Sequence, residues 1–374
     1  TKGGVVVRNL DEGGKFPENF DSYQQVSAGD LVTCLFDVPE TPRTIGLSPH
    51  NGMITGAYDV FEFTERVNPR YFEYYYLALD DRKGLSYFYS GLRNVIRTPV
   101  FLSIPMPVPP LDEQKAIADF LDRELAQIDA LIEKLNQVAV YLDERERSLI
   151  WSMVTKGLEN NSDVKSAGLS WIAQIPSHWE VRKIAGVHKF VTGGTPNSTN
   201  EEFYDGTYPW ITISDLNGDE VRETKSSLSH AGVKAANLQM VPKGALLFSF
   251  KLSVGQVAFT GLDCYTNEAI AAFIPNELIF QRWAFYAYPV FLMQNANWNI
   301  YGARLMNAAL IRGARILLPP IAEQVAIAGI LDAKVSELQA LRKQCHASAE
   351  LMRERRRSLI SAAVTGKIDV RKVA

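Results

Sequence analysis

The side chains that most often catalyse reactions or bind metals show no working arrangement in this chain. Its histidines and cysteines are His50, His178, His188, His230 and His346, and Cys34, Cys264 and Cys345. Their spacing matches no metal-binding pattern. The sequence also lacks a Gly-x4-Gly-Lys-Ser/Thr phosphate loop and an Asn-Pro-Pro-aromatic methyltransferase motif. The residues therefore predict neither a catalytic centre nor a metal site.

Three other groups of side chains could touch a nucleic acid, although a simpler interpretation fits each better. The Gly-Gly-Thr-Pro run at 193–196 could surround a phosphate, but its composition is typical of a tight turn. Four arginines between residues 353 and 357 could bind phosphates, but the neighbouring glutamates favour a solvated or subunit-facing helix surface. The tyrosines at 74–76 could stack on bases, but helical spacing favours core packing.

The size and composition are those of a soluble globular protein with two or three domains. The chain has 374 residues, of which 47% are hydrophobic and 22% charged. No apolar run reaches 18 residues, so we expect no membrane span. Three scattered cysteines and no signal-peptide pattern suggest the cytoplasm. The net charge of −3 is low for a protein that holds DNA alone, because neutralising phosphates supplies much of the affinity. DNA binding would therefore need clustered basic residues or partners that supply charge.

An internal repeat organises the chain. Pro-Pro-Leu-Asp-Glu-Gln at 109–114 returns as Pro-Pro-Ile-Ala-Glu-Gln at 319–324, a shift of 210 positions. The same shift relates Arg-Ser-Leu-Ile at 147–150 to 357–360, and no gap is needed across 47 positions. The unit is far longer than a solenoid repeat. It predicts two copies of a module in which a globular segment precedes a helix.

A long helix is predicted in each copy. From 111 to 154 there is no proline or glycine, and apolar residues recur in alternating steps of four and three from 121 to 153, broken at Glu146. The second copy keeps this register from 331 to 363, interrupted by Arg342 and Arg356. Such a heptad pattern makes helices pack lengthwise.

Both helices carry end signals and need a partner. The Pro-Pro pair blocks backward extension, and Asp112 could cap the first helix. Gly157 and Gly366 stand where a C-terminal stop is expected. Helices of about 45 residues would each be about 65 Å long. We expect them to pair antiparallel about a pseudo-twofold axis, with the globular segments at opposite ends; the alternative is that each helix packs on its own domain.

Two globular segments precede the helices at 109–157 and 319–374. We call them the first head (1–108) and the second head (158–318, with its linker). Both mix short β-type runs with one aromatic helix, which predicts an α+β fold. The predicted strands are 5–7, 31–36 and 60–63, then 210–213, 245–250, 256–259 and 270–274; the aromatic helices lie around 71–76 and 282–286.

The heads are only weakly alike, whereas the helices are closely alike. Gly-Asp-Leu at 29–31 parallels Gly-Ala-Leu at 244–246, and Gly-Leu-Arg at 91–93 parallels Gly-Ala-Arg at 302–304. Residues 170–209 have no counterpart before Thr1, so we expect the first head to lack an N-terminal part. Matched scaffolds with unmatched heads suit a molecule that contacts two different targets with one geometry.

Several motifs are shared with a known family. They are the Pro-Pro-x-x-Glu-Gln start of both helices, the duplicated order of head and helix, and Ile-Pro-Ser-His-Trp-Glu at 175–180, Gly-Gly-Thr-Pro at 193–196 and Tyr-Pro-Trp-Ile at 208–211. Together they resemble the specificity subunit of Type I restriction-modification systems, over nearly the whole chain. The resemblance implies two α/β target-recognition domains separated by two long antiparallel coiled-coil helices.

The same resemblance implies a function and partners. Each head would read one half of a split, asymmetric site on double-stranded DNA, while the helices set the gap. Two modification subunits, which bind S-adenosylmethionine and methylate adenine, would dock on the helix region, and restriction subunits would join to cleave DNA. The chain would then be a non-catalytic subunit with no cofactor of its own. Half-sites read on one face of a duplex lie about one helical turn or a multiple apart, which agrees with a rigid spacer.

Base readers are expected on loops, among Arg, Lys, Asn, Gln and Ser, because these side chains match the donors and acceptors of the major groove. The first-head candidates are Arg43, Thr44, His50, Asn51, Arg93, Asn94 and Arg97. The second-head candidates are Thr195, Asn197, Ser198, Lys251, Ser253, Tyr301, Arg304 and Asn307. For each of them a solvated loop position without DNA contact is the alternative.

Three other functions stay open on the sequence alone. A coiled-coil scaffold with protein-binding heads is favoured by the low basicity. A specificity subunit could also serve a related system whose modification and restriction enzymes are fused. A nuclease or methyltransferase acting alone is disfavoured by the missing motifs. DNA-binding assays with and without a methyltransferase partner would separate the scaffold from the DNA reader.

Overall fold

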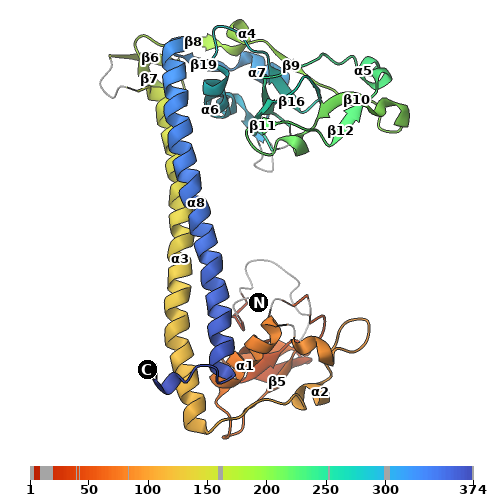
Figure 1. Cartoon of the computed structure of the whole chain (residues 1–374), viewed down its shortest axis with the longest axis vertical. Coiled ribbons are helices and arrows are strands. Elements are labelled where there is room, and N and C mark those ends of the chain that lie inside the picture. The colour runs from red at the N-terminus through yellow and green to blue at the C-terminus, as the bar shows by residue number, and fades with distance from the viewer. Residues whose placement is uncertain are drawn as a thin grey trace. The chain divides into compact units, whose positions relative to one another are not determined.

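The computed structural model describes residues 4–8, 20–38, 40–41, 43–82, 84–158, 163–251, 253–298 and 304–372. The chain divides into two compact units, residues 1–139 with 343–374 and residues 140–342. Each unit therefore holds one head and one half of each long helix (Figure 1). The two helices are shared between the units rather than standing as domains of their own.

The two long helices are α3 (Leu111–Lys156) and α8 (Ile321–Val364). At the start of α3, the Pro110 carbonyl accepts from the Glu113 and Gln114 amides at 2.9 and 3.0 Å. Asp112 lies inside the first turn, so the expectation that it caps the helix was wrong. Gly157 (φ 76°) and Gly366 (φ 71°) follow the two helices in the left-handed conformation, which confirms the expected stops.

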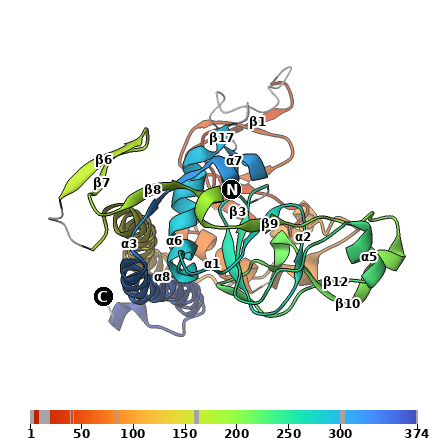
Figure 2. The same cartoon turned by 90° about the horizontal axis from the view of Figure 1, so that it is seen from above.

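Within each unit, parts of α3 and α8 lie side by side, as the end-on view shows (Figure 2). The residues that they bring together show that the two helices run antiparallel. In the first unit the early α3 residues Leu121 and Leu125 share a core with the late α8 residues Ile360 and Val364. In the second unit the late α3 residue Val154 shares a core with the early part of α8. This confirms the expected fold class of two α+β domains with two long, antiparallel helices. The structural reason is the heptad seam, whose apolar positions are buried or half-buried in both copies.

The charged residues that interrupt the seam pair across it. Arg356 Nε donates to Asp129 Oδ1 at 3.0 Å in the first unit. Arg342 Nη1 donates to Asp143 Oδ1 at 2.8 Å in the second unit and lies 3.8 Å from Glu146. The breaks in the apolar pattern are therefore sites of interhelical ion pairs, which help to fix the register of the two helices.

The second head contains a five-stranded sheet of order β11-β14-β13-β16-β9 and a three-stranded sheet of order β12-β10-β15. Helix α6, which carries the aromatic run, packs on the larger sheet through Trp283 and Tyr288, both fully buried. The elements of this unit are β6 Val164–Leu169, β7 Ile172–Pro176, β8 Glu180–Lys183, α4 Ile184–Val187, β9 Phe190–Thr192, β10 Tyr204–Ile211, β11 Glu220–Val221, β12 Ser226–Leu228, α5 His230–Ala235, β13 Leu246–Ser249, β14 Val257–Thr260, β15 Tyr265–Thr266, β16 Ile270–Phe273, α6 Gln281–Phe291, β17 Asn297–Trp298, β18 Arg304–Leu305, α7 Ala308–Gly313 and β19 Arg315–Leu318.

The first head has a three-stranded sheet of order β3-β2-β5 and a separate β1–β4 pair. In its sheet Val32 pairs with Gly46 and Val60, just as Leu247 pairs with Ala258 and Ala272 in the second head. The same three central strands are thus present in both heads. Its elements are β1 Tyr23–Val26, β2 Leu31–Thr33, β3 Ile45–Leu47, β4 Gly52–Thr55, β5 Asp59–Phe61, α1 Pro69–Asp81 and α2 Thr98–Leu102.

Most expected strands and both aromatic helices are present, with shifted ends. The strand expected at 5–7 was wrong, because this segment is bent and irregular. The run at 31–36 is a strand only as far as Thr33, and Ile213 begins a short 3-10 turn instead of ending a strand. The tyrosine run behaves as a core element: Tyr76 is buried and stacks on Phe72 with ring centroids 4.5 Å apart.

Candidate nucleic-acid interface

The glutamine of each Pro-Pro-x-x-Glu-Gln motif joins a head to its long helix. Gln324 is fully buried; its Oε1 accepts from the Phe280 amide at 2.8 Å, and its Nε2 donates to the Leu278 and Pro319 carbonyls at 3.0 and 2.9 Å. The amide therefore joins backbone groups just before α6 to the Pro319 carbonyl just before α8.

The first copy repeats this arrangement. Gln114 Oε1 accepts from the Asn68 amide at 2.7 Å, and its Nε2 donates to the Arg66 and Pro109 carbonyls at 3.2 and 2.8 Å. The motif is thus a structural joint between the head and the start of the helix.

A second joint follows eight residues further along each long helix. In the second unit Asp332 Oδ1 accepts from Arg282 Nε at 2.6 Å and from the Tyr286 hydroxyl at 2.7 Å. Arg282 also lies 2.8 Å from Asp219 and 4.6 Å from the Phe285 ring centre. Burial, with the Asp332 hydrogen bond, raises the pKa of Tyr286, so its hydroxyl remains a donor.

In the first unit Asp122 receives the equivalent pair. The Tyr74 hydroxyl donates to Asp122 Oδ1 at 2.6 Å, and Arg70 pairs with Asp122 and, at 2.5 Å, with Asp119. Arginine and tyrosine are four residues apart on one helix face in both heads, so both can reach one carboxylate. We call Arg70–Tyr74–Asp122 and Arg282–Tyr286–Asp332 the two latches. They mount two different heads on the long helices in one way.

The predicted contact residues of the second head gather around two loops. The Gly-Gly-Thr-Pro run does not form the tight turn that its composition suggested. It is an irregular segment against β15, in which the Gly194 amide donates to the Thr266 carbonyl at 3.0 Å and a side chain at Gly193 would overlap Thr266. Within this segment the Thr195 hydroxyl donates to Glu268, a residue that the sequence had not singled out. That bond and nearby Lys251, 3.9 Å away, outweigh burial and lower the pKa of Glu268.

A second group lies along the loop at 251 and 253–255 and strand β18. Ser253 adopts a positive φ of 47°, and Gly255 after it lies against Met293. Arg304 Nη1 donates to the Met293 carbonyl at 2.9 Å and lies over the Trp298 ring at 4.9 Å. The loop and Arg304 therefore meet at the short turn Leu292–Asn295.

Trp298 is the clearest surface residue that sequence reasoning missed. Its ring is 64% exposed beside an arginine, although tryptophan is usually well buried. An exposed aromatic ring next to a cation suits stacking against a base or sugar. Only its setting in the polar run at 294–300 could have suggested exposure from the sequence.

The remaining second-head candidates differ in whether their side chains are exposed and free of other hydrogen bonds. Ser198 is exposed, and Asn197 is exposed while its side chain accepts from the Thr199 amide at 3.1 Å. Asn307 caps α7 by accepting from the Leu310 amide at 2.8 Å, so its oxygen already has a structural role. Tyr301 lies outside the described residues.

In the first head Arg43 and Thr44 are held inside the structure. Thr44 is buried, and its hydroxyl donates to Asp80 Oδ2 at 2.8 Å, so its choice as a base reader was wrong. Arg43 is half-buried between Glu73 and the Ile45 carbonyl. Because Arg43 and Thr44 are polar and lie between two strands, the sequence suggested that they face solvent. Their loop instead packs these side chains against α1.

The other first-head candidates remain on the surface. Arg93 is paired with Asp37 and lies 5.5 Å from the Phe36 ring centre; the hydrogen bond from Arg93 lowers the pKa of Asp37. Asn94 and Arg97 are exposed beside it. His50 and Asn51 are exposed on a separate turn, where Asn51 Oδ1 accepts from the Ala28 amide at 2.8 Å.

Both heads place the same two segments together. In the first head the loop after β2 meets the arginine segment directly, since the Asp37 amide donates to the Arg93 carbonyl at 3.0 Å. In the second head the loop after β13 meets Arg304 through Met293. We call these segments the reading loops: 34–38 with 93–97 in the first head, and 251 and 253–255 with 304–307 in the second. They have equivalent positions but different side chains.

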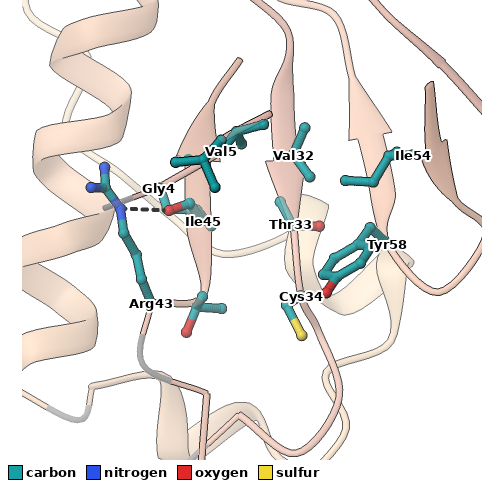
Figure 3. Close-up of a pocket in the computed structure, with 12 residues that line it drawn as sticks. Gly4, Val5, Val32, Thr33, Cys34, Arg43, Ile45, Ile54 and Tyr58 are labelled. Atoms are coloured by element: carbon teal, nitrogen blue, oxygen red, sulfur yellow. Dashed lines mark hydrogen bonds between the residues drawn. The ribbon is translucent and has the colours of Figure 1, made fainter. Parts of the chain in front are cut away.

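A cavity of about 180 Å³ in the first head lies beside β2 and is lined by Val32, Cys34, Ile54 and Tyr58 (Figure 3). The figure shows Arg43 at its side, where its Nε donates to the Ile45 carbonyl. In the second head Leu247, which has the register of Val32, packs with Ile211 and Val191 instead. The lining of the cavity offers no general acid–base pair.

In the part of the chain that the structure describes, His, Cys, Asp and Glu side chains form no group of three that could hold a metal ion. Among the same residues, no helix has the length and apolar character needed to cross a membrane. The reading loops carry hydrogen-bonding side chains and arginines that lie near aromatic rings.

Comparisons with known proteins agree on one family. The model described as "Type I restriction modification DNA specificity domain" matches residues 56–139 and 176–350, which include parts of both heads and of both long helices. The MjaIX specificity subunit of Methanocaldococcus jannaschii is 26% identical over 166 residues, 43% of this chain and 38% of that relative. The StySPI specificity subunit of Salmonella potsdam is 22% identical over an alignment of 391 positions, gaps included, which covers 97% of this chain and 82% of that relative.

Coverage of the relatives varies widely. The match to the HindI specificity subunit of Haemophilus influenzae, 28% identical, spans 28% of this chain and 23% of that relative. The matched part of the chain thus spans well under half of the MjaIX and HindI subunits.

Solved structures share the fold. A chain from a structure on assembly and conformational transition of the type I R-M system superposes with a TM-score of 0.68 at 16% identity, covering 91% of this chain and 83% of that one. The HsdS subunit from Thermoanaerobacter tengcongensis superposes with a TM-score of 0.56, also at 16% identity, covering 92% and 82%.

Proposed function

The chain belongs to the Type I restriction modification DNA specificity family, and from this membership we propose that it is the DNA-recognition subunit of a Type I restriction-modification complex. Each head reads one half of a split, asymmetric site on double-stranded DNA. The long helices hold the heads and set the unread gap between the half-sites. The chain performs no catalysis itself.

One observation carries this proposal: two heads with different reading loops have the same mount. The glutamine joint and the latch recur residue by residue in both units. The reading loops present Asp37 and Arg93 in one head, and Lys251 and Arg304 in the other, where Trp298 lies beside Arg304. A common mount with different surface chemistry supports two readers of different sequences.

The partners supply the chemistry and part of the charge. Two modification subunits dock on the helix region, bind S-adenosylmethionine and methylate adenine; restriction subunits join them to cleave DNA in the cytoplasm. The net charge of −3 supports this division, because a phosphate grip supplied by the partners leaves the heads free to read bases. If the modification and restriction enzymes are fused, the helix region binds that fused enzyme and the heads read DNA for it.

Selection of bound DNA from a random pool tests the proposal. The complete complex is assembled with wild-type chain, with Arg304→Ala plus Lys251→Ala, or with the matched first-head change Arg93→Ala plus Asn94→Ala. We expect wild type to select a split motif, and each variant to lose information at one half only, with about 1–3 kcal/mol less discrimination per lost base contact. A motif that weakens at both halves in either variant, or no motif for wild type, contradicts the proposal.

A further inference from the structure

Arg93 lies in a short turn of the first head that backbone hydrogen bonds close. Ser90 and Val95 exchange amide-to-carbonyl bonds of 2.9 and 3.0 Å across the base of the turn. Inside it, Gly91 and Asn94 adopt positive φ values of 70° and 47°. The closed turn presents the Arg93 side chain to solvent, where 68% of it is exposed.

A second loop is tied to this turn by its backbone. The Asp37 amide donates to the Arg93 carbonyl at 3.0 Å, and the Ile96 amide donates to the Leu35 carbonyl at 2.8 Å. Asp37 has a positive φ of 46°, and its carbonyl accepts from the Thr41 amide at 3.1 Å. The aspartate is therefore held in a left-handed conformation, with its side chain beside the arginine.

The Asp37 carboxylate holds one side of the Arg93 guanidinium. Arg93 Nε donates to Asp37 Oδ1 at 3.1 Å, and Nη2 donates to Oδ2. The same guanidinium lies over the Phe36 ring, with its central carbon 5.5 Å from the ring centre. A two-point bond to a carboxylate, together with the ring, fixes both the plane and the direction of the group.

The other end of the Arg93 guanidinium stays open. Its five N–H groups lie in one plane, so Nη1 and the second N–H of Nη2 point away from the carboxylate that binds Nε and Nη2. Among the described residues, no acceptor bonds this outer end. The structure thus holds a pair of parallel donors in a fixed direction on an exposed surface.

Two parallel donors match one base in the major groove. Guanine presents its N7 and O6 acceptors side by side, whereas adenine and cytosine present an amino donor and thymine a single acceptor. A phosphate fits this arginine less well, because the neighbouring Asp37 carboxylate offsets the positive charge and repels an anion. The pair therefore favours a guanine edge over the DNA backbone.

The second head fixes its equivalent arginine by other means. Gly-Ala-Arg at 302–304 is the counterpart of Gly-Leu-Arg at 91–93. Arg304 lies 4.9 Å from the Trp298 ring centre and donates through Nη1 to the Met293 carbonyl at 2.9 Å. Both arginines thus combine an aromatic ring with a fixed acceptor. The acceptor of Arg304 is a neutral carbonyl, so the acidic partner is a feature of the first head.

We propose that Arg93 reads a guanine in the half-site of the first head, and that Asp37 is the positioning residue that directs it to the base. This rests on the proposed function and adds the base and the residue that orients its reader. Ion pairs this exposed contribute little to folding, so removing the Asp37 charge should change recognition rather than stability.

Selection of bound DNA from a random pool by the complete complex tests the proposal, with Arg93→Lys and Asp37→Asn beside wild type. Lysine keeps the charge without the fork, and asparagine tolerates the left-handed backbone at position 37. We expect wild type to select a guanine in the first half-site. Each variant should lose about 10-fold of the preference for guanine at that single position, with the other positions unchanged.

The salt dependence of binding separates positioning from a merely structural role. Without the carboxylate Arg93 can bind phosphate, so Asp37→Asn should bind unrelated DNA more tightly, with a log–log slope against salt steeper by about one. The matched control is Glu220→Gln, which neutralises the acid of a similarly exposed pair with Arg222, 2.7 Å apart and outside the reading loops. The control should keep both the motif and the slope.

The outcomes separate this proposal from the proposed function. A split motif whose first half lacks guanine refutes the guanine reader and leaves the proposed function standing. The positioning role of Asp37 is refuted if Asp37→Asn keeps the guanine preference and the salt slope, or if Glu220→Gln changes them as much. If wild type selects no motif at all, the proposed function fails as well.

Discussion

At the scale of single residues, Asp332 and Asp122 have equivalent roles. One oxygen of Asp332 accepts from both Arg282 and Tyr286, and Asp122 pairs with Arg70 and Tyr74. Each arginine also has a second acceptor, since Arg70 pairs with Asp119 and Arg282 with Asp219. The two latches should therefore respond alike to the same change.

Asp332→Asn should lower the free energy of unfolding by about 1–2 kcal/mol, because it replaces a partly exposed charge-assisted pair with a neutral one. Asp122→Asn should cost about as much, since each arginine keeps its second acceptor, Asp119 in one latch and Asp219 in the other. Urea unfolding of both variants beside wild type measures this. A loss in one variant only would show that the two latches are not energetically equivalent.

His188 gives the second head a pH dependence. The ring is buried, Nδ1 lies 2.5 Å from the Tyr288 hydroxyl and Nε2 lies 3.0 Å from the Ile274 carbonyl. Burial lowers its pKa from 6.5 to about 4, against the opposing effect of the Ile274 hydrogen bond. The folded head therefore holds a neutral imidazole at pH values where the unfolded chain takes up a proton.

Above pH 6.5 the ring is neutral in both states and has no effect on stability. Between pH 6.5 and 4 the unfolded chain binds the proton first, so stability should fall by about 3 kcal/mol, and this contribution levels off below pH 4. Denaturant curves for wild type and His188→Gln at pH 7.5, 5.5 and 4.5 measure it. If the variant keeps the same slope, another group is responsible.

The sequence predicted the types of residue on the reading loops better than it predicted which side chains are exposed and free to contact DNA. Arg93, Lys251 and Arg304 lie on the surface where two segments meet, as their loops suggested. Thr44 failed because its burial depends on Asp80, a partner 36 positions away that no local pattern reveals. Trp298 was missed for the opposite reason, since composition rules place tryptophan inside.

At the scale of elements, the long helices followed directly from the heptad spacing, and their ends from glycine. The prediction that Asp112 caps α3 was wrong because the two prolines before this helix already fix its first turn through the Pro110 carbonyl. The heads were harder, because short strands pair across long sequence separations and their ends depend on the partner strand.

The two terminal glycines form a matched pair for testing helix ends. A side chain at Gly157 would lie 2.7 Å from Glu323 and 3.0 Å from Trp179, whereas nothing lies within 4 Å at Gly366. Both need a left-handed backbone, so each change to alanine should cost about 1 kcal/mol, and Gly157→Ala should cost about 1 kcal/mol more from crowding. Thermal unfolding compares them; a larger loss at Gly366 would contradict the packing argument.

At the scale of the whole molecule, the repeat defines two units built to one plan. The spatial division crosses both long helices, so neither unit is a continuous stretch of chain. The sequence alone revealed the duplication and the seam. It could not reveal that each helix belongs half to one unit and half to the other, because that depends on which halves meet.

The proposed spacer role makes a quantitative prediction. One extra heptad inserted in register at equivalent positions of α3 and α8 keeps the seam and adds about 10 Å of helix. The selected DNA motif should then keep both half-sites, with a gap longer by about three base pairs. An insertion of three residues breaks the seam and should abolish binding; an unchanged gap after the heptad insertion would show that the helices do not set it.

The most direct measurement is methylation-sensitive sequencing of a methylation-free host genome that expresses the chain with its modification subunit. The account predicts methylated adenines within one motif made of two unlike halves and a gap of fixed length. A single continuous motif, or a genome without added methylation, would contradict it.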